Sequence, residues 1–173
     1  MFRRKYNIDG FIQTFKARLV VKDFTQKKGV DYFDTYSLVA RMTSNRVLFA
    51  LASIYKLYVH QMDVKTTFLN GDLKEKVYMK QPEGFILPVN EEKVCKLVKS
   101  LYGLKQALKQ WHEKFDKVIL LIGFHYNGVD KCMYSKFTKD FGMIVCFYVD
   151  DMLIFSKGIS LLNLKWKILV NYI

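Results

Sequence analysis

The sequence predicts an α+β fold in which a sheet has helices packed on one face. Residues 104–122 place apolar side chains at the i, i+3, i+4, i+7 spacing of an amphipathic helix, and short β-rich runs flank this segment. Helices that alternate with short strands are typical of such a layered domain. With 51% hydrophobic and 16% aromatic residues among 173, the chain has enough apolar material for one packed domain, or for one domain plus a small attached lobe.

The first third of the chain predicts two strands with a helix between them. Residues 16–22 place Leu, Val and Val between basic ends, as a short strand does. A helix is expected to start at a cap formed by Thr43 or Ser44, and a strand at 58–62 follows it. The apolar face of this helix would consist of Val47, Leu48, Leu51, Ala52 and Tyr55.

The rest of the chain predicts short strands around the long helix. These strands are expected at 77–80, 94–98 and 131–137. Gly123 is placed to end the helix as a C-cap. Residues 143–149 and 152–155 look like the two arms of a tight hairpin, and 160–173 has weak helical periodicity.

The charge of the chain favours a polyanionic partner. Twenty-eight Lys and Arg residues stand against sixteen Asp and Glu, which gives a formal net charge of +12, and the basic residues are spread along the chain. A folded surface of this kind fits nucleic acid, while simple solubility is the alternative explanation. No basic amphipathic helix indicates a membrane surface.

The cysteines and the apolar runs predict an intracellular protein. The three cysteines, Cys95, Cys132 and Cys146, are widely spaced and form no zinc pattern, so we expect free thiols in a reducing compartment. There is no secretory signal, and the longest apolar run, 143–149, is too short to span a bilayer. Cytoplasm or nucleus is therefore the expected location.

Three aspartates lie at the ends of predicted strands. Asp150 and Asp151 stand between two apolar β-rich runs, where an exposed hairpin turn is the simplest explanation. Asp63 ends another predicted strand. If the two strands are neighbours, the carboxylates converge and need divalent cations to offset their repulsion. Two such ions about 3.5–4 Å apart suit in-line phosphoryl transfer.

The chain resembles the reverse transcriptases of Ty1/copia retrotransposons. Tyr148-Val149-Asp150-Asp151 matches the YxDD box of that family. Five further segments occur in the family's order, and six ordered segments are far more specific than one box. These segments are KARLVVKDFTQKKGVDY (16–32), YSLVARMTS (36–44), VHQMDVKTTFLNG (59–71), VYMKQPEGF (77–85), CKLVKSLYGLKQALKQW (95–111) and FYVDDMLIFSKG (147–158).

The resemblance implies a fold and a reaction. It implies a right-hand polymerase whose fingers and partial palm occupy 1–158, with a divergent tail at 159–173 and with thumb and ribonuclease H absent. The implied activity is RNA-directed DNA polymerisation by two-metal nucleotidyl transfer to a primer 3′-hydroxyl. Two Mg²⁺ ions, or Mn²⁺, would be cofactors. The implied partners are an RNA template, a DNA primer and deoxynucleoside triphosphates, with no membrane.

The resemblance also assigns roles to the carboxylates and to one basic strand. Asp63 and Asp150 would bind the metal ions, and Asp151 would complete the acidic cluster as a lesser ligand. Lys16 and Arg18 match the basic fingers strand that meets the incoming triphosphate. The alternative for these two side chains is an ordinary solvated strand end.

Four more positions match the nucleotide pocket of the family. Phe68 matches the aromatic residue that crowds a ribose 2′-hydroxyl, although core packing is the alternative. Tyr102, Gly103 and Lys105 match the block that lines the nucleotide site and supports the template. Lys105 is equally compatible with a solvated charge in the first turn of the helix.

Departures from the family pattern keep a second function open. The family usually has Gly at Asp23, Pro at Leu38 and Pro-Arg at Leu108-Lys109. Lys109 keeps the charge of the arginine but loses its bidentate fork. Together with the divergent tail, these changes leave an inactive, truncated remnant that only binds nucleic acid as the alternative. An unrelated ferredoxin-like module would explain the fold but not the ordered segments.

Overall fold

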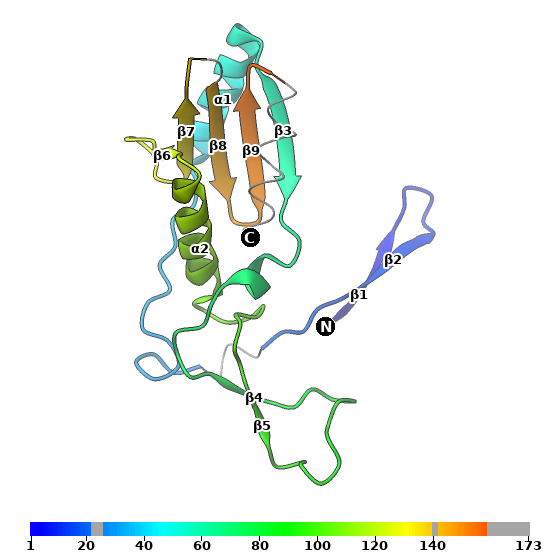
Figure 1. Ribbon diagram of the computed structural model, residues 1–173. Helices are drawn as coiled ribbons and strands as arrows, with labels where there is room; N and C mark the ends of the chain where they lie inside the picture. Colours follow the sequence, from blue (N-terminus) through cyan, green and yellow to red (C-terminus); the bar gives the residue numbers. More distant parts are fainter. Residues whose placement is uncertain (22–25, 140–141, 159–173) are drawn as a thin grey trace.

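The computed structural model describes residues 1–21, 26–139 and 142–158, and it confirms the mixed α+β class (Figure 1). Its strands and helices are β1 (Phe2–Tyr6), β2 (Ile12–Ala17), α1 (Met42–Tyr55), β3 (Tyr58–Asp63), the 3₁₀ helix η2 (Thr67–Asn70), β4 (Tyr78–Lys80), β5 (Val94–Lys96), α2 (Ala107–Leu121), β6 (His125–Tyr126), β7 (Met133–Phe137), β8 (Gly142–Tyr148) and β9 (Asp151–Ser156). Among these described elements, no helix combines the length and apolar character needed to cross a membrane.

A five-stranded sheet in the order β3-β9-β8-β7-β6 forms the centre of the molecule, and all its neighbouring strands are antiparallel. The two helices cover opposite faces of this sheet (Figure 1). Val145 and Phe147 of β8 belong to the apolar cluster that includes α2, whereas Ile144 and Cys146 pack in the cluster of α1. The prediction of helices on one face was therefore wrong. Because β8 is apolar on both faces, a helix has to pack on each face to shield it from water.

Helix α2 follows the predicted amphipathic pattern closely. Trp111, Phe115 and Ile119 are fully buried against the sheet, and the Phe115 ring stacks on that of Phe147 with centroids 4.2 Å apart. The helix begins at Ala107 rather than at 104. Gly123, with φ of 85°, follows its last turn and donates its N–H to the carbonyl of Leu120, which confirms the predicted end.

Helix α1 was predicted in the right place but with the wrong cap. Its N-cap residue is Arg41, which makes no side-chain capping bond. The carboxylate of Asp130 instead accepts hydrogen bonds from the Arg41 N–H at 3.0 Å and the Ser44 hydroxyl at 2.8 Å. Of the predicted apolar face, Leu48 and Ala52 are buried, whereas Val47, Leu51 and Tyr55 are exposed.

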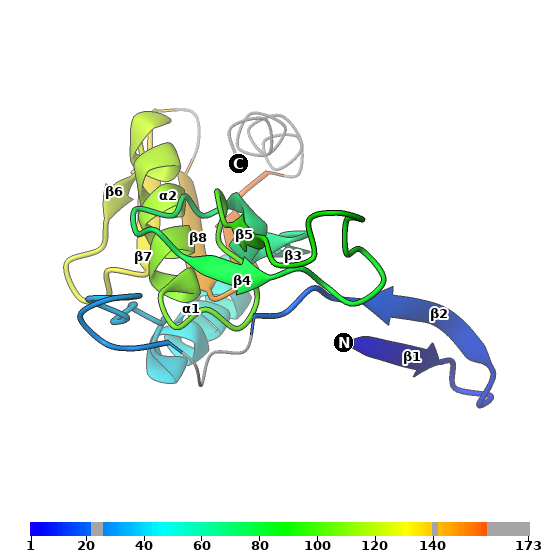
Figure 2. The same ribbon diagram turned by 90° about the horizontal axis from the view of Figure 1, so that it is seen from below.

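Two small hairpins extend from the body of the molecule. The β1–β2 hairpin projects away from the sheet, as Figure 2 shows from below, and the β4–β5 pair lies on another side. β2 ends at Ala17, so the strand predicted at 16–22 is displaced toward the N-terminus. The strands predicted at 77–80 and 94–98 are confirmed in shorter form. Asp23 and the helix expected at 160–173 lie outside the described residues.

Candidate active site

The pairing of β3 with β9 brings together the aspartates that the sequence separates. Asp63 is the direct cross-strand neighbour of Asp151, and Asp151 pairs with Tyr148 across the β8–β9 hairpin. Val149 and Asp150 are therefore the two central residues of the hairpin turn. The N–H of Val64 donates to the backbone carbonyl of Asp150 at 3.0 Å, which joins this turn to the end of β3.

One cavity of about 360 Å³ opens beside the turn, and both Asp63 and Asp150 line it. Asp151 is not among its described lining residues, and the Oδ1 of Asp151 instead accepts a hydrogen bond from the Gln61 amide at 3.2 Å. The described residues of the wall are Lys16, Ala17, Arg18, Leu19, Asp63, Val64, Lys65, Thr66, Leu69, Leu101, Tyr102 and Asp150. The structure thus brings two of the three predicted carboxylates to one space.

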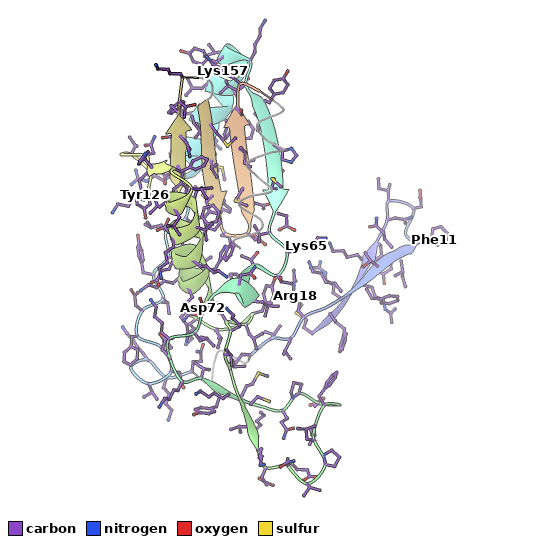
Figure 3. The ribbon with its side chains drawn as sticks, in the orientation of Figure 1. Phe11, Arg18, Lys65, Asp72, Tyr126 and Lys157 are labelled. Atoms are coloured by element: carbon purple, nitrogen blue, oxygen red, sulfur yellow. The ribbon has the colours of Figure 1, made fainter. Side chains whose placement is uncertain are left out.

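Three cationic side chains share this space with the carboxylates. Lys16, in β2, and Arg18, just after β2, are both half-buried, and Lys65 follows β3. Figure 3 shows Arg18 and Lys65 between the end of the sheet and the N-terminal hairpin. Carboxylates that face each other across strands repel, so nearby cations stabilise the arrangement. The sequence interpretation missed Lys65, although its place two residues after Asp63 was a signal.

Arg18 is fixed by contacts to Tyr102. The N–H of Val21 donates to the Tyr102 carbonyl at 2.8 Å, and Val20 forms an isolated parallel bridge with Tyr102. The Arg18 guanidinium lies 5.3 Å from the centre of the Tyr102 ring, within the range of a cation–π contact. Its buried Nε has no hydrogen-bond partner among the described residues. A buried donor of this kind suits an anionic ligand.

The remaining predicted pocket residues lie around the cavity rather than on its described wall. Phe68, in η2, is half-buried behind Tyr102, and the two rings meet edge to face with centroids 5.0 Å apart. Gly103 packs against Val21 through its backbone. The ammonium of Lys105 lies 5.1 Å from the centre of the Tyr32 ring, away from the aspartates' cavity.

The donor set fits a metal that arrives with its substrate. Within 1–21, 26–139 and 142–158, no group of three or more His, Cys, Asp or Glu side chains is arranged to hold a metal ion. Mg²⁺ is commonly bound by one or two carboxylates together with substrate phosphates and water, not by an all-protein cage. Asp63 and Asp150 line a cavity that also holds cationic side chains, and their carboxylates would supply the protein's share of a site of this kind.

Sequence comparisons identify the family of the chain. Residues 1–171 match the family model described as reverse transcriptase (RNA-dependent DNA polymerase). The chain belongs to this family. The Pol polyprotein of transposon TNT 1-94 from Nicotiana tabacum is 47% identical over 163 residues, 94% of this chain. The Pol polyprotein of transposon RE1 from Arabidopsis thaliana is 39% identical over the same share, which places this reverse transcriptase chain with the copia type.

The chain corresponds to a small part of these relatives. It spans 12% of the TNT 1-94 polyprotein and 11% of the RE1 polyprotein. The Ty1-DR4 Gag-Pol polyprotein of Saccharomyces cerevisiae is more distant, with 31% identity over 85% of this chain and 9% of its own length. No solved structure matches the chain.

Proposed function

We propose that this chain performs RNA-directed DNA polymerisation at the cavity shared by Asp63 and Asp150. The observation that supports this proposal is the convergence of these two carboxylates on one cavity with Lys16 and Arg18. The family's description names the same reaction. In this proposal the five-stranded sheet corresponds to the palm, and the β1–β2 hairpin corresponds to the fingers.

Each residue has a defined task in the proposed reaction. Asp63 and Asp150 would hold two Mg²⁺ ions, or Mn²⁺, with Asp151 as a lesser ligand that Gln61 orients. The bound ions would activate the primer 3′-hydroxyl and stabilise the leaving pyrophosphate oxygen. Lys16 and Arg18 would bind the triphosphate through charge-assisted hydrogen bonds.

The aromatic pair would shape the sugar side of the pocket. Phe68 would crowd a ribose 2′-hydroxyl, and its edge-to-face contact would hold the Tyr102 ring against the cavity. Gly103 allows the close approach of Val21 to this block. Lys105, half of a cation–π pair with Tyr32, would support the template strand.

Primer extension on an RNA template tests the proposal. The wild-type chain with Mg²⁺ and deoxynucleoside triphosphates should extend a DNA primer, and Asp150→Asn or Asp63→Asn should lower the rate at least about 100-fold because one metal-binding carboxylate is lost. Asp72→Asn is the matched control, since Asp72 pairs with Lys99 in an exposed ion pair away from the cavity. No extension by the wild type, or equal rates in all variants, would contradict the proposal.

A non-catalytic nucleic-acid-binding protein is the second candidate. The exposed β1–β2 hairpin favours it, because register places Arg3 opposite Lys16 while Phe2 and Phe15 remain 91% and 75% exposed. Basic and aromatic side chains together suit single-stranded nucleic acid. This candidate predicts salt-dependent RNA binding without extension, and the binding would be unchanged in Asp150→Asn.

A further inference from the structure

The turn that presents Asp150 has a backbone conformation that its sequence disfavours. Val149, the first central residue of the turn, has φ of 59°. A β-branched residue rarely adopts this left-handed region, because its side chain crowds the neighbouring carbonyl. Such a conformation persists only where surrounding contacts stabilise it against relaxed alternatives.

Two hydrogen bonds from different elements hold the central carbonyls of this turn. The indole N–H of Trp111, on α2, donates to the backbone carbonyl of Val149 at 2.9 Å. The N–H of Val64, after β3, donates to the carbonyl of Asp150 at 3.0 Å. The Val64 bond ties the turn to the strand of Asp63, and the Trp111 bond ties it to the helix on one face of the sheet.

Trp111 is itself held in place by the core. It is fully buried, and its ring lies 6.1 Å, centre to centre, from the rings of both Phe115 and Phe147. A buried indole N–H without an acceptor is costly. The left-handed conformation of Val149 and the hydrogen bond of Trp111 therefore stabilise each other.

We infer that Trp111 is a positioning residue for the carboxylate pair. Its indole N–H fixes the peptide that joins Val149 to Asp150, and the position of this peptide determines how Asp150 lines the cavity with Asp63. Trp111 is not on the described wall of the cavity, so it acts through the turn. The metal-binding part of this inference rests on the proposed function, whereas the effect on the turn does not.

Substitutions distinguish a tryptophan that positions the turn from one that only packs in the core. Trp111→Phe retains an aromatic ring in the core but removes the donor. Phe115→Leu is the matched control, because Phe115 is also fully buried on α2 and contacts Phe147. Val149→Gly relieves the left-handed strain, since glycine adopts positive φ readily. In the Trp111→Phe/Val149→Gly double variant, loss of the indole should therefore disturb the turn less than it does in Trp111→Phe alone.

The experiment combines hydrogen exchange at residues 148–152 with Mn²⁺ titration followed by electron paramagnetic resonance. Trp111→Phe should raise exchange in the turn and weaken Mn²⁺ binding, each by about tenfold, the usual effect of one lost hydrogen bond. Adding Val149→Gly to Trp111→Phe should return both the exchange rate of the turn and the Mn²⁺ affinity most of the way to their wild-type values. Phe115→Leu should lower the melting temperature. It should leave the Mn²⁺ affinity, and the exchange of the turn relative to that of the sheet, near the wild-type values.

Two results separate this inference from the proposed function. If Trp111→Phe behaves like Phe115→Leu, with a lower melting temperature but an unchanged turn and unchanged Mn²⁺ affinity, the positioning role is refuted. If the wild type binds no Mn²⁺, the proposed function fails. In that case the exchange of the turn still decides whether Trp111 fixes the Val149 peptide.

Discussion

Gly103 is the residue at which the backbone leaves no room for a side chain. Its φ is 91°, and a Cβ built on it would lie 2.1 Å from the carbonyl oxygen of Val21. This close approach lets the Val21 N–H reach the Tyr102 carbonyl, beside the Arg18 contact. The family resemblance predicted that Gly103 belongs to the nucleotide site, and the structure gives a separate, steric reason for a glycine here.

Gly103→Ala should lower the free energy of unfolding by about 2–4 kcal/mol, because it adds a steric clash to the left-handed strain. Gly84→Ala is a matched control. Gly84 also has positive φ, at 82°, but nothing lies within 4 Å of its Cβ position, so the loss should be about 1 kcal/mol. Urea denaturation measures both values. Equal losses would show that crowding at Val21 has no role.

The three thiols should differ sharply in reactivity. Burial raises the pKa of both Cys132 and Cys146 to about 12, with Asp130 adding to the effect, whereas Cys95 is half-buried on β5. Thiolate is the reactive form, so the two buried thiols should react with a disulfide reagent at pH 8 at least 100-fold more slowly than Cys95. Stopped-flow absorbance, with Cys95→Ser as control, checks this. Three equal rates would contradict it.

Sequence patterns located the aspartates but not the contacts that orient them. Asp63 and Asp150 were predictable because apolar strand segments lie beside both. The bonds from Gln61 to Asp151 and from Trp111 to Val149 join residues distant in the chain. Trp111 lies in the apolar stripe of a helix, and nothing in that pattern distinguishes a hydrogen-bonding tryptophan from an ordinary core residue.

Among the elements, α1 depends on a residue far away in the chain. Asp130 is 6% exposed, and its carboxylate accepts bonds from the N–H groups of Arg41 and Cys132 and from the Ser44 hydroxyl. Burial by itself raises the pKa of this carboxyl, but the hydrogen bonds lower it below its ordinary value. No acidic residue lies in the first turn of α1, so Asp130 also complements the helix dipole.

Asp130→Ala should therefore destabilise the protein by about 1–3 kcal/mol, since it leaves the first turn of α1 without its acceptor. Thermal unfolding and hydrogen exchange of α1 measure the loss. Asp9→Ala, at an exposed aspartate of the N-terminal hairpin, should change stability by less than about 0.5 kcal/mol. Unchanged exchange in α1 would show that the cap is dispensable.

Amphipathic elements were predictable, and exposed ones were not. The stripe of α2 shows helical periodicity, and β8 and β9 are recognisable as apolar runs on either side of the two aspartates. β1 is exposed at every position, so its sequence has no alternation that indicates a strand. The cap of α1 could not be found near residue 42, because Asp130, whose carboxylate accepts the hydrogen bonds of the first turn, lies beyond α2 in the chain.

At the scale of the whole molecule, one buried histidine should influence stability. His112 is 6% exposed between α2 and the sheet, with its Nε2 3.8 Å from the Cys132 sulfur and its Nδ1 3.9 Å from an Asp116 oxygen. Burial lowers the pKa of His112 below its ordinary value of 6.5, against the attraction of Asp116 and Glu113. The unfolded chain therefore binds this proton more readily than the folded protein does.

The stabilising contribution of neutral His112 should be complete above pH 6.5 and should be lost as pH falls toward its lower folded pKa. The free energy of unfolding should decrease by up to about 1.4 kcal/mol per pH unit in this window. Urea denaturation between about pH 5 and 7.5 tests this. His112→Gln should flatten the slope, whereas His60→Gln, at an exposed position of β3, should not. A flat wild-type profile would contradict the assignment.

The placement of both helices on opposite faces was the main feature that sequence reasoning missed. The continuous apolar run at 143–149 was recognised as a strand. Because this strand is apolar on both faces, a helix has to pack against each face of the sheet. The pairing of β3 with β9 is a second global feature, and it arises from contacts across the whole chain. The active-site proposal depends on this pairing, because it brings Asp63 to the β8–β9 turn.

The most direct test of a shared metal site at Asp63 and Asp150 is calorimetric titration of Mg²⁺ into the protein with a deoxynucleoside triphosphate present. We expect Asp63→Asn and Asp150→Asn each to weaken Mg²⁺ binding at least about tenfold. Because the carboxylates share one site, the double variant should lose less binding free energy than the sum of the two single losses. Asp72→Asn should bind as the wild type does. Wild-type Mg²⁺ affinity in either single variant would contradict the claim that these two aspartates act together.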